Sequence, residues 1–95
     1  MAKYRSRIIS AGGSVTYYDP ANGTDFQLEE LQKIVGGYIE IVYLNDKLVM
    51  VVNDEGKLNG LPVNSIATAA YQIARQYTND FIVGDVLICD KELIK

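Results

Sequence analysis

Few residues of this chain have the chemistry of a nucleophile or a general base. Cys89 is the only cysteine, and there is no histidine. A reactive thiolate depends on a nearby base or cation, and histidine is the residue that most often supplies it. Because Cys89 ends the apolar run that begins at Val86, we predict a buried structural thiol. The missing histidine excludes a Ser-His-Asp triad, and we predict no catalytic residue.

Carboxylates are the remaining groups with catalytic potential. Asp54 and Glu55 fall in a turn-forming stretch, and Asp85 precedes a late β-prone segment. Carboxylates alone can hold Mg²⁺ or Ca²⁺, so a small metal-dependent nucleotide-processing enzyme is one alternative. Their spacing matches no calcium loop, and acids in turns commonly accept hydrogen bonds from local amides. We therefore expect no metal and no cofactor.

Cations near the N-terminus could bind a phosphate. Lys3, Arg5 and Arg7 alternate with other residues, which places them on one face of a predicted strand. The following segment 12–14, Gly-Gly-Ser, could offer backbone amides to an anion. The segment lacks the lysine and spacing of a P-loop. The alternative is an edge strand whose charges prevent aggregation.

Composition limits the class of protein. The chain has 95 residues, 48% of them hydrophobic and 22% charged, which predicts one domain spanning residues 1–95. Its net charge is -3, and every acidic residue lies from Asp19 onward. This balance argues against general binding to duplex nucleic acid. There is no apolar run of membrane-spanning length and no recognisable leader, so we expect no membrane contact and a cytoplasmic location.

Turn and cap signals predict the elements of the first half. Residues 19–23 are dense in turn formers, and Thr24 to Gln27 fits a capping box that would begin a helix. The helix should bury an apolar stripe and end at Gly36-Gly37. The predicted stripe consists of Leu28, Leu31, Ile34 and Val35.

The middle of the chain predicts an antiparallel hairpin. Segments 38–44 and 48–52 are rich in β-branched and aromatic residues, and Asn45-Asp46-Lys47 separates them. Segment 48–52 is apolar throughout, so we expect both of its faces to be covered. Asn53 to Gly56 should form a turn with Gly56 in a left-handed conformation, and Lys57-Leu58 a short strand.

A second helix and further strands follow. Asn64 or Ser65 can cap a helix whose predicted core-facing residues are Ile66, Ala69, Ala70, Ile73 and Tyr77. Segments 81–83 and 86–89 are β-prone. The fold class is therefore α+β, a mainly antiparallel sheet of four to six short strands with two helices packed on it.

Aromatic usage points to an interaction surface. Seven tyrosines accompany two phenylalanines and no tryptophan. Tyrosine is favoured at interfaces because it combines apolar area with a polar tip. We expect Tyr17, Tyr18 and Tyr38 near the surface. Sheet packing with exposed hydroxyls is the alternative.

Four segments in order resemble a family of small uncharacterised proteins, mostly from bacteriophages, mobile elements and gut bacteria, known only as a domain of unknown function. They are Leu31–Glu40, Asn53–Leu58, Leu61–Asn64 and Ile82–Val86. The resemblance starts at Leu28 and leaves the first 23 residues unmatched. It implies no enzyme activity and no particular ligand.

The resemblance does imply a setting, because small acidic phage proteins often inhibit host defence proteins or sequester nucleotide signals. Our leading hypothesis is a non-enzymatic, homo-oligomeric binding protein of a phage or mobile element that inhibits a host defence or regulatory component. The alternative is a sponge for a phosphorylated nucleotide at an intersubunit pocket. Predicted contact residues are Arg5, Arg7, Tyr17, Tyr18, Asn53, Glu55, Gly56 and Asn64.

Overall fold

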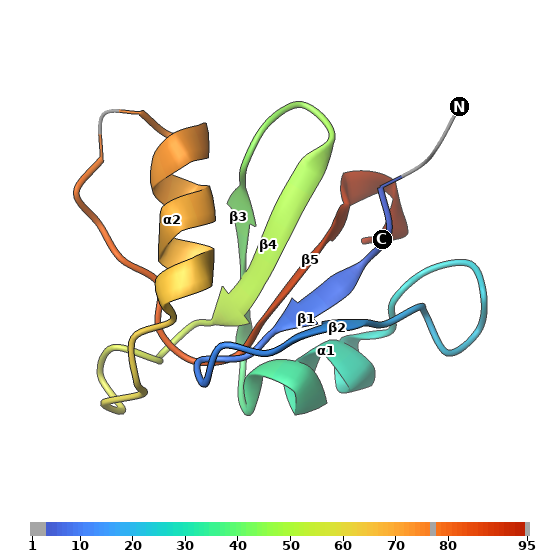
Figure 1. Cartoon of the computed structure of the whole chain (residues 1–95). Coiled ribbons are helices and arrows are strands. Elements are labelled where there is room, and N and C mark those ends of the chain that lie inside the picture. Colours follow the sequence, from blue (N-terminus) through green and yellow to red (C-terminus); the bar gives the residue numbers. More distant parts are fainter. Residues whose placement is uncertain (1–3, 77, 95) are drawn as a thin grey trace.

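The computed structural model describes residues 4–76 and 78–94, and its centre is a five-stranded antiparallel sheet (Figure 1). The order of the strands is β2-β1-β5-β4-β3. The strands are β1 (Arg7–Ile9), β2 (Val15–Tyr17), β3 (Ile39–Tyr43), β4 (Leu48–Asn53) and β5 (Val86–Asp90). The helices are α1 (Leu28–Val35), α2 (Ser65–Ala74) and the short 3-10 helix η1 (Lys91–Leu93). The predicted α+β fold is confirmed.

The two long helices cover opposite faces of the sheet (Figure 1). Side chains alternate between the faces along a strand, so β4 and β5 each contribute to two cores. Val49, Val51, Leu87 and Cys89 pack on the side of α1. Met50, Val52, Val86 and Ile88 pack on the side of α2. The prediction that segment 48–52 is covered on both faces is confirmed, because its alternating side chains are buried in the two cores.

The N-cap of helix α1 is Gln27, three residues after the expected cap Thr24. The Gln27 backbone amide donates to Glu30 Oε2 at 3.0 Å. Thr24 does not cap the helix, because it lies in a turn where its amide and hydroxyl donate to Asn22 Oδ1, and the helix starts only after Gln27. The predicted left-handed stop is confirmed at Gly36, with φ of 80°. Leu28 was wrongly placed in the buried stripe, since it is 53% exposed at the first position of the helix.

Helix α2 is rotated from the predicted orientation. Its buried residue is Ala67, and Ala70 and Tyr71 pack against the same core. Ile66 and Ile73, which we expected in the core, are 40% and 76% exposed. The two stripes differ by one residue, which is a rotation of about 100°.

The N-terminal strand is shorter than its alternating cations suggested. It begins at Arg7, and Lys3 lies outside the described residues. A turn with Gly13 at φ of 98° connects it to the exposed edge strand β2. Within the described part of the chain, no helix is long and apolar enough to span a membrane.

Candidate functional site

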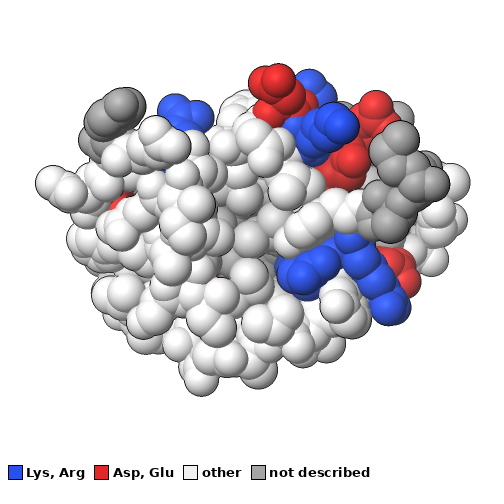
Figure 2. Space-filling view, turned by 45° about the horizontal axis from the view of Figure 1, so that its top comes forward, with Lys and Arg blue, Asp and Glu red and all other residues white. Residues whose placement is uncertain are grey.

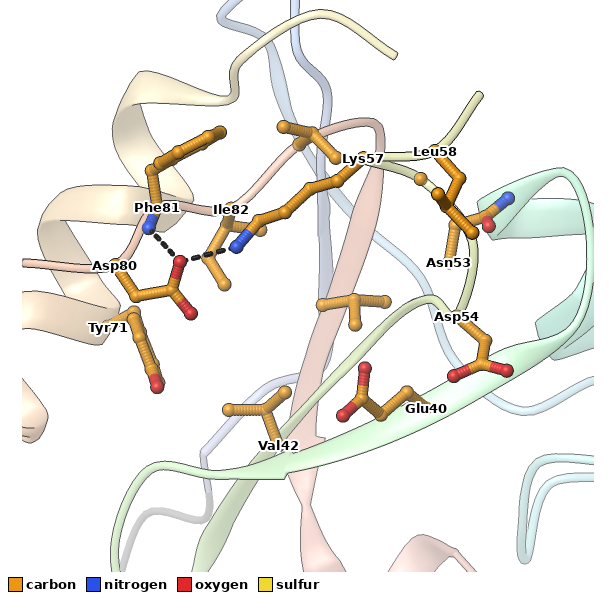
Figure 3. A pocket seen from close by; sticks show the side chains of 13 residues that line it. Glu40, Val42, Asn53, Asp54, Lys57, Leu58, Tyr71, Asp80, Phe81 and Ile82 are labelled. Carbon is orange, nitrogen blue, oxygen red and sulfur yellow. Dashed lines mark hydrogen bonds and ion pairs between the residues drawn. The ribbon is translucent and has the colours of Figure 1, made fainter. Parts of the chain in front are cut away.

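A pocket of about 200 Å³ opens on the α2 side of the sheet (Figure 3). It lies between the β3–β4 hairpin, the loop that follows β4, helix α2 and the segment that leads to β5. Its lining residues are Glu40, Val42, Val52, Asn53, Asp54, Gly56, Lys57, Leu58, Tyr71, Asp80, Phe81, Ile82 and Val83. The pocket therefore joins parts of the chain from Glu40 to Val83, which are 43 positions apart in sequence.

Two of the predicted contact residues, Asn53 and Gly56, line the pocket and hold its backbone in place. Asn53 is buried, and its side-chain amide donates to the Val35 carbonyl at 3.0 Å while its oxygen accepts from the Glu55 amide. This side chain therefore ties the end of α1 to the loop after β4. Gly56 is buried, and a Cβ there would lie 2.8 Å from Val83 Cγ2.

The loop after β4 differs from its prediction in two respects. Gly56 does not have a positive φ, whereas Gly60 does, at 68°. Gly56 is needed for close packing, not for a left-handed turn. Lys57 and Leu58 form part of a turn and not a short strand, because the Leu61 amide donates to the Gly56 carbonyl and closes the loop.

An ion pair crosses the mouth of the pocket. Lys57 Nζ donates to Asp80 Oδ1 and lies 4.5 Å from the centre of the Phe81 ring. The Phe81 amide donates to the same carboxylate oxygen at 2.9 Å. The Lys57 hydrogen bond, followed by that of the Phe81 amide, lowers the pKa of Asp80. Figure 3 shows the lysine chain extending from the loop toward Asp80, with Tyr71 below it.

A second cluster combines arginine and tyrosine at the N-terminal edge of the sheet. The Arg5 guanidinium lies 4.4 Å from the centre of the Tyr17 ring, and that of Arg7 lies 5.1 Å from the same ring and 4.4 Å from Tyr4. Burial raises the pKa of Tyr4, although Arg7 opposes that rise. The structure thus brings together three of the predicted contact residues. The expected surface position of Tyr17 is confirmed, since it is 53% exposed.

Tyr18 is part of a different contact. Its hydroxyl donates to Glu30 Oε1 at 3.3 Å, and its ring stacks with Phe26 at a centroid distance of 6.0 Å. Burial and the neighbouring Glu30 carboxylate raise its pKa. Tyr18 therefore fixes the segment before α1 on that helix.

Backbone amides in and beside the turn at residues 12–14 already donate hydrogen bonds within the protein. The amides of Gly13 and Ser14 donate to the carbonyl and hydroxyl of Ser10, and the Ala11 amide donates to Asp85 Oδ1 at 2.9 Å. A carboxylate thus occupies the position beside the turn where an anion was expected. The interaction also holds Asp85 at the β1–β2 turn, and not beside Asp54.

Asn64 supports the structure from inside. It is fully buried, and its side-chain amide donates to the carbonyls of Ile9 at 2.9 Å and Gly84 at 2.8 Å. Its oxygen accepts from the Ala67 amide and caps α2, as predicted. Glu55, another of the predicted contact residues, is exposed and lines a separate hollow with Gly37 and Tyr38.

The thiol is buried, and the candidate carboxylates do not cluster among the described residues. Cys89 is buried, as predicted, and this burial raises the pKa of its thiol to about 12. In the described chain, no three acidic or cysteine side chains gather in a way that could hold a metal ion. Asp54, Glu55 and Asp85 are therefore not brought together.

The outer face of α2 is a third surface feature. Between Leu61 and Ala74 the chain has no charged residue. Ile66 and Ile73 are exposed on one side of the helix, with the exposed Ala69 between them. Figure 2 shows that charged side chains gather toward the top and right of this view, whereas the left side, where Figure 1 places α2, is largely uncharged.

Sequence reasoning missed most of the pocket. Lys57 was expected in a strand, and Glu40 was not singled out as a contact residue. The only local signal was the turn from Asn53 to Gly56, which forms one wall. The remaining walls come from distant segments, so no motif spacing could have revealed them.

The fold and this pocket define a small α+β protein in which an antiparallel sheet lies between two helices and a ligand-sized hollow opens beside the second. Residues 12–93 match the model of the family described as Domain of unknown function (DUF3846), and the chain belongs to that family. The match begins well before Leu28, so it covers more of the chain than the resemblance did. Neither the curated proteins nor the solved structures contain a significant match.

Proposed function

We propose that this chain is a non-enzymatic binding protein that attaches to another protein through the outer face of α2. The supporting observation is the apolar stripe of Ile66, Ala69 and Ile73 on a helix without charged residues. Isolated apolar side chains are common on protein surfaces, but a continuous uncharged stripe is typical of an interaction site.

The size of the stripe indicates the shape of the partner. A helix of ten residues is about 15 Å long, and one apolar side of it about 10 Å wide, so the stripe offers roughly 150 Å². A stable dimer buries about 800 Å² per partner. Two copies that meet only along this stripe would bury too little. A different protein with an apolar groove would enclose more of the helix, and this is the partner we propose.

The family resemblance supports a biological setting for this partner. We propose that the chain serves a phage or mobile element in the bacterial cytoplasm and inhibits a host defence or regulatory protein. Such an inhibitor acts by occupying a surface of its target. The prediction of a homo-oligomer is addressed by measuring the mass of the purified protein in solution.

The test is binding by surface variants. The double variant Ile66→Ser/Ile73→Ser should lose at least 10-fold in affinity for a protein captured from bacterial lysate and then purified, measured by calorimetry. Leu28→Ser is the matched control, because Leu28 is also an exposed apolar residue of a helix. Exposed substitutions of this kind change stability by only about 0.5 kcal/mol.

Two results would reject the proposal. The first is equal binding by the wild type, the double variant and the control. The second is light scattering that shows a dimer which the double variant abolishes, because the stripe would then bind a second copy of the chain.

A phosphorylated nucleotide is the second candidate, as a ligand of Arg5 and Arg7. The supporting observation is that both guanidinium groups contact the Tyr17 ring, although Arg5 also lies 3.8 Å from the Asp19 carboxylate. Arginine presents several donors to a phosphate at once. Arg5→Ala/Arg7→Ala should abolish nucleotide binding by calorimetry, whereas Lys33→Ala/Lys47→Ala, with the same change in charge, should preserve it. Unchanged binding by the arginine variant excludes this ligand site.

A further inference from the structure

The pocket beside α2 has an unbalanced set of charges. Three carboxylates line it, from Glu40, Asp54 and Asp80, against the single ammonium of Lys57. Lys57 pairs with Asp80. Within residues 4–76 and 78–94, neither Glu40 nor Asp54 has a hydrogen-bond or ion-pair partner for its side chain. Both residues are exposed to solvent at the rim of the pocket, so their carboxylates are accessible to a cation.

The β3–β4 hairpin holds these two carboxylates on one side of the pocket. Glu40 lies opposite Val52, and the Asp54 amide donates to the Tyr38 carbonyl at 2.9 Å, which continues the same ladder. The two residues are therefore diagonal neighbours on one face of the hairpin, with Cα atoms roughly 7 Å apart. Figure 3 draws both carboxylates at the same side of the pocket. One cation between them could contact both.

Next to the carboxylates the pocket is apolar. Val42 and Val52 extend from the same sheet face, and Ile82 and the Tyr71 ring lie across from them. The volume of about 200 Å³ corresponds to roughly seven groups the size of a water molecule, at about 30 Å³ each. This space suits a chain of four or five heavy atoms. It is below the roughly 300 Å³ at which pockets for larger ligands begin.

The chain's own lysine shows how an ammonium is held at this site. Lys57 Nζ contacts a carboxylate and the face of an aromatic ring together, the two features that most favour a cation. This pair forms one wall of the pocket and leaves the Glu40 side open. A second ammonium at that side would meet the carboxylates of Glu40 and Asp54, while Tyr71 lies across the pocket beside Asp80 (Figure 3).

We propose that the pocket binds an alkylammonium group, with the nitrogen between Glu40 and Asp54 and the alkyl stem against Val42 and Val52. The stem is the length of a lysine side chain or of a short diamine. This site is separate from the Ile66–Ile73 stripe, so either proposal can fail without the other.

The test is an amide-resolved NMR titration at pH 7 with n-butylamine, and with n-butanol as the uncharged analogue. The amine should bind at about 1 mM, the range expected of such a small ligand, and shift the amides of Asp54, Tyr71 and Phe81. Butanol should bind at least 10-fold more weakly. Equal binding of the two compounds would overturn the proposal, because the carboxylates would then have no role.

Matched charge variants complete the experiment. Glu40→Gln/Asp54→Asn should weaken butylamine binding at least 10-fold while the spectrum keeps its native dispersion. Asp46→Asn/Glu92→Gln removes the same charge from exposed positions outside the pocket and should leave binding unchanged. An equal loss in both variants would mean that the amine responds only to net charge, and would also overturn the proposal.

Two further probes distinguish the source of the ammonium. Cadaverine represents a free diamine, and Nα-acetyl-lysine N-methylamide represents a side chain of another protein. Tighter binding of cadaverine than of butylamine supports a free diamine as the ligand. Tighter binding of the lysine derivative supports a protein side chain. Absence of saturable shifts with all three amines rejects the site.

Discussion

Replacing Asn64 should test how the fold is held together near the start of α2. This side chain is fully buried and makes three hydrogen bonds, to the carbonyls of Ile9 and Gly84 and from the amide of Ala67. It therefore connects β1, the turn before β5 and the first turn of α2. Asn64→Ala removes all three bonds at a place that water does not reach.

The expected cost follows from these contacts. Each hydrogen bond contributes about 1 kcal/mol, so the loss is about 3 kcal/mol. A domain of this length has a free energy of unfolding of roughly 5 to 14 kcal/mol, so Asn64→Ala should remove a large share of it. The exposed neighbour Ser65 is the control, because Ser65→Ala leaves the cap intact and should cost less than about 0.5 kcal/mol.

A second substitution at the same position separates the cap from the two carbonyl contacts. Asn64→Asp keeps an oxygen for the Ala67 amide but turns a carboxylate toward the carbonyls of Ile9 and Gly84. The introduced carboxyl should have a folded-state pKa above the unfolded value of about 3.9, since only its protonated form can donate. Its destabilisation should therefore be full at pH 7 and shrink as the pH falls toward 4.

The measurement is urea unfolding followed by far-ultraviolet circular dichroism. A loss of less than about 1 kcal/mol for Asn64→Ala would show that an ordinary exposed cap is all that Asn64 provides. If the loss of unfolding free energy in Asn64→Asp is the same at pH 7 and at pH 4, the proposed donation from Asn64 to the two carbonyls is refuted.

Two further predictions concern the buried thiol and the loop after β4. Because burial raises the pKa of Cys89 to about 12 from a usual value of 9.0, the folded state keeps its proton where the unfolded state loses it. The free energy of unfolding should fall as the pH rises above 9, by up to about 1.4 kcal/mol per pH unit. Urea unfolding of Cys89→Ala should lack this pH dependence. Rapid labelling of the Cys89 thiol in the folded protein at pH 8 would contradict its burial. Gly56→Ala should cost about 1 to 3 kcal/mol because its methyl would meet Val83, and Val83→Ala should relieve the cost in a double-mutant cycle of urea unfolding. Gly12→Ala, whose methyl would have only an ordinary contact at 3.7 Å, is the control, and an equal loss in both glycine variants would exclude the clash.

Local patterns predicted the sheet and the ends of several elements. The β-branched runs on either side of Asn45-Asp46-Lys47 do pair as an antiparallel hairpin, and Asn64 does cap α2. These features depend on neighbours in sequence, such as a turn of fixed length or a side chain that reaches an amide three residues away. The same local reasoning failed for Thr24, because Asn22 Oδ1 holds this residue in a turn and the helix starts only after Gln27.

The rotation of α2 was decided by tertiary contacts. Residues 66, 69, 70 and 73 form one apolar stripe and residues 67, 70, 71 and 74 another, and both have helical spacing. Sequence alone favoured the stripe with the larger side chains. The bonds of Asn64 to β1 and to the turn before β5 select the other, which places small alanines against the sheet and leaves Ile66 and Ile73 exposed.

The candidate site depended even more on the tertiary structure. The sequence by itself determined that the chain lacks histidine, that its single thiol is flanked by apolar residues and that Asn53 to Gly56 forms a turn. The pocket needs Glu40, Lys57, Tyr71 and Asp80, which come from a strand, a loop, a helix and a connecting segment. They meet because the antiparallel sheet and α2 pack together, and this long-range packing leaves no pattern in the spacing of the residues.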